Sequence, residues 1–282
     1  MEMKNKGFTP LEKVSNFNRH RFNRCFLTGF SIIELLVVIA TISLLLSIML
    51  PCLGRAKDEC KGLICQSRLR QMIIAADVYV CNNNGYYPLA GFMDFSDTGA
   101  QKEWDFFKTF EAGELKECVP GFLWQGGGIM EVQQCPSFRG NSNSAGDLFT
   151  GYNYNASYIG GLLACGFGIT LGSKSSKIDE VVRSSDCAIF GDGEFVLGAN
   201  KYMRSPQAGK LDKDFGDSYR YAGTQGYRHM GRTNTAYCDG RVAAVSERYS
   251  ETKSKAVIDE YNKQSVVKVG FLSMDNREYD LK

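Results

Sequence analysis

The sequence predicts an α+β protein in which a long N-terminal helix packs against a mainly antiparallel β-sheet. Residues 30–50 form an unbroken apolar run, and in residues 51–81 apolar side chains recur every three or four positions, as one face of a helix requires. The 30 glycines of the 282-residue chain include loop-like runs such as 126–128, which indicates strands joined by turns over residues 82–282. Irregular loops are expected between about Gly91 and Ser176.

The apolar run is long enough to span a membrane. It holds 21 residues with Glu34 as its only ionisable side chain. A helix rising about 1.5 Å per residue crosses the roughly 30 Å hydrocarbon layer over that length. A carboxylate inside this layer costs about 2.5–3.5 kcal/mol on insertion scales. We therefore predict a transmembrane helix over residues 30–50 in which Glu34 is paired or functional.

Residues 1–29 precede the apolar run as a basic leader. They carry six basic and two acidic side chains, and such an excess of Lys and Arg keeps its side of a span in the cytoplasm. We predict a single-pass protein of the inner (cytoplasmic) membrane, with a cytoplasmic N-terminus and a periplasmic or extracellular globular domain over residues 82–282. The charged leader residues are Glu2, Lys4, Lys6, Glu12, Lys13, Arg19, Arg21 and Arg24.

The start of the apolar run resembles a known processing signal. Residues 29–34 read Gly-Phe-Ser-Ile-Ile-Glu, which resembles the class III signal of type IV prepilins and type II secretion pseudopilins. The resemblance implies that prepilin peptidase cuts after Gly29 and methylates the new amine of Phe30. It also implies that Glu34 of a neighbouring subunit neutralises that amine, and that Pro51 occupies the place of a kinking proline. An ordinary signal anchor with a chance glutamate is the alternative.

Residues 51–81 are predicted to continue the span as an amphipathic helical stem. The run Asn-Asn-Asn-Gly at 82–85 should end this helix because Asn and Gly tolerate a left-handed backbone, and Pro88 cannot continue it. The stem is expected to pack on its own domain. The apolar positions that suggest its buried stripe are Leu53, Ala56, Cys60, Leu63, Ile64, Met72, Ile73, Ala76 and Tyr79.

A second resemblance lies nearer the C-terminus. Nine residues separate His229 from Asp239-Gly240, which resembles the His-x9-Asp-Gly signature of prepilin-processing-associated proteins. Segments around Cys65 and Cys135 are also similar to motifs of these proteins, and this similarity makes the two residues our preferred disulfide. Spacing alone leaves the connectivity open, because eight exported cysteines allow 105 complete pairings, and several can be buried free thiols.

Without the family, the segment around Asp239-Gly240 predicts a β-hairpin. A two-residue type I′ turn should join strands over residues 233–238 and 241–245. The expected cross-strand pairs are Cys238 with Arg241, Tyr237 with Val242, and Ala236 with Ala243.

His229, Asn234 and Asp239 form the structural motif of this segment. We expect His229 to hydrogen-bond a loop to the hairpin. A metal site is the alternative, but only one histidine follows the leader, which makes a weak case for zinc. An oxygen-ligated calcium site at Asp239 or Asp192 is also open.

The remaining polar features do not predict catalysis or nucleic-acid binding. Asp192-Gly193-Glu194 follows an apolar strand and is interpreted as a solvated turn, and no nucleophile elbow frames a serine. Losing the leader's six basic and two acidic residues changes the net charge from +2 to about −2, which gives no electrostatic footprint for nucleic acid. We predict no enzyme activity and no cofactor.

These observations predict a structural function. The chain would be a pseudopilin or minor pilin of a type II secretion or type IV pilus-like fibre, with prepilin peptidase and other pilin or pseudopilin subunits as partners. The alternative is an exported ligand-binding or adhesive protein that uses the prepilin pathway for delivery without forming a fibre. An extracytoplasmic enzyme is a third class, which no catalytic motif supports.

Overall fold

A computed structural model describes residues 30–94, 99–125, 130–142, 144, 146–195, 198–214 and 217–282. The chain divides into two compact units, Met1–Leu50 and Pro51–Lys282. The predicted leader, including the cleavage residue Gly29, lies outside the described residues, as does the glycine run 126–128.

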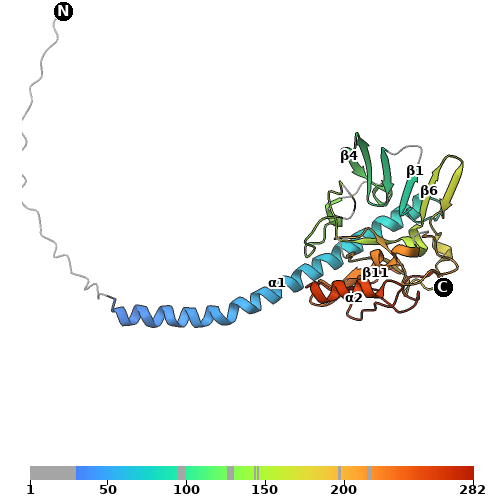
Figure 1. The fold of residues 1–282 in the computed structure, drawn as a ribbon. Coiled ribbons are helices and arrows are strands. Elements are labelled where there is room, and N and C mark those ends of the chain that lie inside the picture. The colour runs from blue at the N-terminus through green and yellow to red at the C-terminus, as the bar shows by residue number, and fades with distance from the viewer. Residues whose placement is uncertain are drawn as a thin grey trace, which may run out of the picture. The chain divides into compact units, whose positions relative to one another are not determined.

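The predicted long helix is present as α1, Ile32–Asn82 (Figure 1). It begins with a capping box, in which the Ile33 amide donates to Ser31 Oγ at 3.3 Å and the Ser31 amide donates to Glu34 Oε2 at 2.9 Å. All of its residues in the first unit are exposed. By length and composition, this apolar part is able to cross a membrane.

The part of α1 in the second unit, which includes Pro51, is amphipathic, but its buried face differs from the predicted stripe. Met72, Ile73 and Ala76 are buried as expected, whereas Leu53, Ala56, Cys60, Leu63 and Ile64 are exposed. Between Pro51 and Gly62 apolar side chains occur on both faces of the helix. Periodicity alone therefore predicted the wrong buried face for this part of α1. The predicted stop is confirmed, since Asn84 and Gly85 follow the helix with positive φ. The buried helix residues are Gly62, Cys65, Leu69, Met72, Ile73, Ala76 and Val80.

Two main sheets confirm the α+β class. The first sheet has six strands in the order β4-β3-β2-β1-β6-β7, antiparallel except where β1 pairs with β6. The prediction of irregular loops over residues 91–176 is therefore wrong. These strands are short and partly charged, so their sequences lack clear apolar alternation. Their bounds are β1 Gly91–Asp94, β2 Ala100–Glu103, β3 Phe106–Glu111, β4 Glu114–Pro120, β6 Leu162–Gly166 and β7 Ile169–Gly172.

The second sheet carries the predicted hairpin. Its order is β12-β11-β8-β5-β9, with β5 and β9 parallel and the other pairs antiparallel. Its strands are β5 Asn153–Asn155, β8 Ala188–Gly191, β9 Tyr202–Met203, β11 Thr233–Tyr237 and β12 Val242–Val245. A further pair joins β10 Gln225–Gly226 to β13 Val269–Gly270, and helix α2 is Lys255–Gln264. Short helical turns are η1 Phe122–Trp124, η2 Met130–Gln133, η3 Ala156–Gly160, η4 Ile178–Glu180 and η5 Asp217–Gly223.

The hairpin has a longer loop and a different register than predicted. Ala236 pairs with Val242, not with Ala243. Gly240 has φ +88°, but Asp239 is not among the residues with positive φ, so a type I′ turn cannot form there. The Gly240 amide instead donates to the Tyr237 carbonyl at 3.0 Å, and the Tyr237 amide donates to the Arg241 carbonyl at 2.9 Å. This is a three-residue loop with Gly in the left-handed position.

The hydrophobic core joins α1 to both sheets. Leu69 and Met72 of the helix belong to the same buried cluster as Trp104, Tyr154 and Phe190. These three rings lie with centroids 5.1–5.7 Å apart, within the range of favourable aromatic pairs. The core therefore holds the second half of α1 in a fixed rotation, which sets the direction in which Cys65 points.

Candidate functional site: two thiols, a carboxylate and an imidazole

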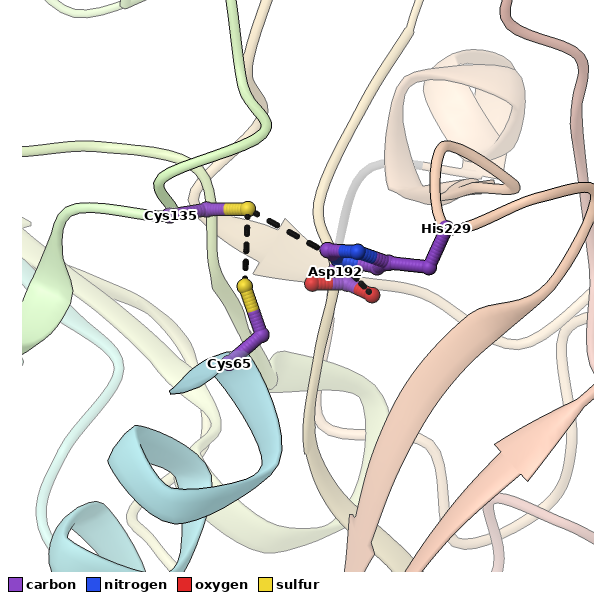
Figure 2. Close-up of side chains that lie close together, drawn as sticks. All are labelled: Cys65, Cys135, Asp192 and His229. Carbon is purple, nitrogen blue, oxygen red and sulfur yellow. Dashed lines mark hydrogen bonds and ion pairs between the residues drawn. The ribbon is translucent and has the colours of Figure 1, made fainter. Parts of the chain in front are cut away.

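Four chemically active side chains meet inside the second unit. They are Cys65, Cys135, Asp192 and His229, all buried, and one ligand atom of each lies within 4.8 Å of those of the others. We call them the thiol cluster. Figure 2 shows that they come from four segments, and that their functional groups point toward a common centre. Cys65 comes from α1, Cys135 from the loop after η2, Asp192 from the end of β8, and His229 from a turn before β11.

The contacts form a chain through the cluster. Cys65 Sγ lies 3.2 Å from Cys135 Sγ, and Cys135 Sγ lies 3.8 Å from His229 Nε2. His229 Nε2 in turn lies 3.2 Å from Asp192 Oδ2 (Figure 2). The same imidazole nitrogen therefore faces both the Cys135 sulfur and the Asp192 carboxylate.

The loop that carries Cys135 is held from two sides. Arg68, one turn beyond Cys65 on α1, donates a hydrogen bond to the Gln134 carbonyl, and the Cys135 amide donates to the Thr150 carbonyl at 3.1 Å. Gly151 has φ +119°, and a Cβ at that position would lie 2.6 Å from the Cys135 Cβ. Only glycine fits there without moving Cys135.

Asp192 is placed by the second sheet. Its amide donates to the Asn234 carbonyl at 3.1 Å, and the Asn234 amide donates to Asp192 Oδ2 at 2.6 Å. The residue is fully buried, so its interpretation as a solvated turn is wrong. The sheet explains this: β8 pairs with β11, and the residue that follows β8 is thereby brought against Asn234.

His229 is placed by a tight turn. The amides and carbonyls of His229 and Arg232 bond each other at 3.0 and 3.1 Å. The two residues between them, Met230 and Gly231, both have positive φ, as a type I′ turn requires. The turn geometry that we predicted at Asp239-Gly240 thus occurs here. His229 reaches the hairpin through Asp192, which binds Asn234 of β11.

Electrostatics favour a thiolate at Cys135. Burial raises the pKa of this thiol, but hydrogen bonding with Cys65, the Arg228 charge and His229 together hold the pKa well below its ordinary value. The hydrogen bond with Cys135 and burial both raise the pKa of Cys65. Burial lowers the pKa of His229, but its contacts with Asp192 and Cys135 outweigh this and raise it to about 9.

A buried arginine lies beside the cluster. The Arg228 guanidinium donates to the Gly193 carbonyl at 2.7 Å and to the Gly151 carbonyl at 3.2 Å. It also lies 3.3 Å from Glu194 Oε2 as an ion pair. Arg228 therefore adds a fixed positive charge next to residues that ionise negatively.

Within the cluster, Asp192 Oδ1 and His229 Nδ1 have no hydrogen-bond partner among the described residues. A buried polar atom without a partner costs about 1–3 kcal/mol. The cluster is thus not fully satisfied by the protein's own groups.

The structure locates the other predicted site residues as follows. Phe30 is exposed, Glu34 caps α1, and Pro51 lies inside α1. Asp239 is not in the thiol cluster, and its Oδ1 accepts from the Arg241 amide at 2.9 Å. The nine cysteines that the structure describes are free thiols, and the 3.2 Å between the sulfurs of Cys65 and Cys135 exceeds the roughly 2.05 Å of a disulfide.

Sequence reasoning brought together only part of this cluster. The resemblance paired Cys65 with Cys135, and it singled out His229, but nothing joined the three to Asp192. The sequence offered one signal for Asp192, which is its position directly after the apolar strand Ala188–Gly191.

The cluster differs in geometry from a hydrolytic triad, and its donor atoms could hold a metal ion. In a Cys-His-Asp triad, the nucleophile and the carboxylate contact opposite nitrogens of the imidazole. Here both contact Nε2, and all four side chains are buried. Two sulfurs, one nitrogen and one carboxylate oxygen are donors that suit a borderline-soft cation such as Zn²⁺.

No protein-family model matches this chain, and no curated protein or solved structure is significantly similar to it.

Proposed function

We propose that this chain is a membrane-anchored structural subunit, a pseudopilin or minor pilin of a type II secretion or type IV pilus-like fibre. In this proposal prepilin peptidase cleaves after Gly29 and methylates the amine of Phe30. The observation that carries the proposal is the start of α1, where an apolar helix with exposed side chains begins directly after the cleavage-like residues and holds Glu34 as its only charge up to Leu50.

Glu34 has two roles to separate in any test. Its carboxylate accepts from the Ser31 amide and so caps α1. A carboxylate offers about four acceptor positions, so the cap leaves room for the Phe30 amine of a neighbouring subunit. In low dielectric this attraction between opposite charges is strong. The proposal therefore assigns Glu34 both to helix initiation and to assembly.

The first experiment is mass spectrometry of the mature N-terminus. The proposal expects a chain that begins at N-methylated Phe30, and it expects Gly29→Val to leave the full-length precursor, because a side chain at the cleavage position obstructs the peptidase. A mature chain that begins at any other residue would refute the proposal.

The second experiment separates the charge of Glu34 from its cap. Glu34→Gln keeps an acceptor for the Ser31 amide but removes the charge, whereas Ser31→Ala removes the Oγ cap and keeps the charge. Crosslinking of subunits in membranes should fall strongly for Glu34→Gln and little for Ser31→Ala. Equal crosslinking by Glu34→Gln and the unaltered chain would contradict the assembly role. Correct processing without any fibre would favour the exported ligand-binding or adhesive alternative.

A further inference from the structure

We propose that Cys65, Cys135, His229 and Asp192 bind one Zn²⁺ ion in a closed structural site. The site would fasten the second half of α1 to the loop after η2 and to the second sheet. This inference does not depend on the proposed fibre function, because it concerns how the globular unit is held together.

Two of the three donor separations along the contact chain lie within about 0.2 Å of those around a small tetrahedral ion, and the third, between the two sulfurs, is about 0.6 Å shorter. With Zn–S near 2.3 Å and Zn–N or Zn–O near 2.0–2.1 Å, the edges of a tetrahedron are about 3.8 Å between sulfurs, about 3.6 Å from sulfur to nitrogen and about 3.4 Å from nitrogen to oxygen. The corresponding separations here are 3.2 Å for Cys65–Cys135, 3.8 Å for Cys135–His229 and 3.2 Å for His229–Asp192. Small side-chain rotations would bring all four donors to one ion.

The charges of the cluster also fit a divalent cation. Ionising both thiols and Asp192 places three negative charges beside a neutral imidazole, and a divalent ion reduces this excess to one. Arg228 is buried next to the cluster and is paired with Glu194, so this ion pair adds no net charge beside the site. Coordination needs both thiols ionised and the imidazole neutral, so the protons that Cys65 and His229 hold are released to solvent.

The unpartnered atoms point to the same conclusion. Asp192 Oδ1 is buried without a hydrogen-bond partner among the described residues, although Oδ2 accepts from the Asn234 amide. The Asn234 bond orients the carboxylate, as a supporting hydrogen bond does around metal ligands. An ion bound by Oδ1 would give this oxygen the partner that it lacks, whereas Oδ2 already contacts His229 Nε2 and the Asn234 amide.

A disulfide between Cys65 and Cys135 is the competing state. It requires the two sulfurs to close from 3.2 Å to about 2.05 Å. A disulfide would account for two of the four converging side chains and would leave His229 and Asp192 with only their link to Asn234 of the hairpin. The zinc site uses all four.

The test uses the full chain, purified in detergent from cells grown with zinc. After dialysis we expect about one zinc per chain by elemental analysis, with Cys65 and Cys135 unreactive toward a thiol reagent until a chelator is added. Cys65→Ser and His229→Ala should each lose that zinc. The matched control is Cys60→Ser, an exposed thiol on the same helix, which should keep it. Equal loss of zinc from Cys60→Ser would overturn the proposal.

A second measurement needs no variant. The chelator-treated wild-type chain is titrated with Co²⁺, which should give intense thiolate-to-cobalt absorption and the strong visible bands of a tetrahedral site, both displaced by Zn²⁺. Peptide mapping without reductant is run on the same preparation. A Cys65–Cys135 disulfide would overturn the proposal, and so would a reduced chain that takes up neither metal.

Discussion

Two buried polar clusters lie in the second unit, and they meet the cost of burial in different ways. The thiol cluster has donors that converge on a point and atoms that lack partners. The other cluster consists of Glu103, Asp105, Lys108, Asp147 and Lys201, and we call it the ion cluster. There, Lys201 Nζ lies 2.7–2.9 Å from carboxylates of Glu103, Asp105 and Asp147. Lys108 Nζ lies 3.0 Å from Glu103 and 2.9 Å from Asp147.

The ion cluster supplies its own cations. Three carboxylates face two ammonium groups, so full ionisation leaves one negative charge in excess. Asp105 is the acid that carries this excess: burial raises its pKa to about 7, although Lys201 acts in the opposite direction. Burial also acts on Glu103, but Lys201 and Lys108 outweigh it and lower the pKa of Glu103 to about 2.

The two clusters differ in how far their own polar groups are paired, and this difference separates a purely structural cluster from a candidate binding cluster. In the ion cluster each ammonium group contacts at least two carboxylates, so a further ion has no evident place. In the thiol cluster none of the four side chains carries a permanent positive charge, and Asp192 Oδ1 and His229 Nδ1 have no partner among the described residues. Donor atoms that converge on one point without a permanent cation among them are the feature that indicates a ligand.

The largest expected effect comes from removing the central cation of the ion cluster. Lys201→Met leaves three buried carboxylates facing only Lys108, and breaking a buried pair in this way typically costs about 3–5 kcal/mol. Denaturant unfolding of the full chain in detergent measures it. The control is Lys116→Met, which removes an exposed pair with Glu111 and should change stability by less than about 1 kcal/mol. Similar losses for both variants would show that the ion cluster is not the structural element we infer.

The next effect is a pH dependence carried by Asp105. Its folded pKa of about 7 lies above the unfolded value near 3.8, so the unfolded chain loses this proton first. The contribution of Asp105 to the free energy of unfolding is therefore greatest below about pH 4. It falls by up to about 4 kcal/mol as the pH rises to about 7.

Asp105→Asn tests this dependence, because an amide keeps an acceptor for the Phe106 amide and cannot titrate. The difference in unfolding free energy between the variant and the unaltered chain should grow in favour of the variant from pH 4.5 to 7.5. Glu103 acts in the opposite direction, but only between about pH 4.5 and 2, outside this range. A difference that stays constant would contradict the assignment of the excess charge to Asp105.

A smaller effect is expected from moving Cys135 without changing it. Gly151→Ala places a methyl group 2.6 Å from the Cys135 Cβ at a backbone φ of +119°, so we expect a loss of about 1–3 kcal/mol. The reactivity of Cys135 toward a thiol reagent, with chelator present, should also change. Gly240→Ala is the matched control, since it has φ +88° but no atom within 4 Å. It should lower stability and leave Cys135 unchanged.

The sequence was sufficient for the parts of the fold that depend on local physics. The length of α1 and its stop at Asn84-Gly85 follow from periodicity and backbone preference, and both are confirmed. The capping box also has a local signature, Ser31 followed three residues later by Glu34. We interpreted Glu34 only as a charged residue within the membrane span. The predicted hairpin is present, but its predicted register is wrong. Asp239 does not adopt the positive φ that a two-residue type I′ turn needs, and a three-residue loop forms instead.

The clusters could be predicted only in part because they depend on long-range pairing. Asp192 was interpreted as solvated because a turn residue is usually exposed, and the β8–β11 pairing that buries it is not visible from spacing. The ion cluster was not predicted at all. Its members come from strands of the first sheet, from loops and from the residue before β9, and Lys201 is separated from Glu103 by 98 residues. Such contacts are set by how the sheets pack, not by any local pattern.

The smallest expected effect concerns the support around the thiol cluster. Gln66 Nε2 donates to Asn234 Oδ1 at 3.1 Å and so joins α1 to β11. Gln66→Ala removes this part-buried hydrogen bond and should cost about 0.5–1.5 kcal/mol. The matched control on the same helix is Gln71→Ala. The exposed Gln71 side chain bonds the Ser67 carbonyl at 3.4 Å, and its removal should have almost no effect.

Because β11 is held by its ladders with β8 and β12, the Asn234 amide should still bind Asp192 in Gln66→Ala, and the reactivity of Cys135 should stay the same. A clear rise in that reactivity would mean that the position of Asp192 depends on the helix, and that the thiol cluster is less independent of its surroundings than the ion cluster.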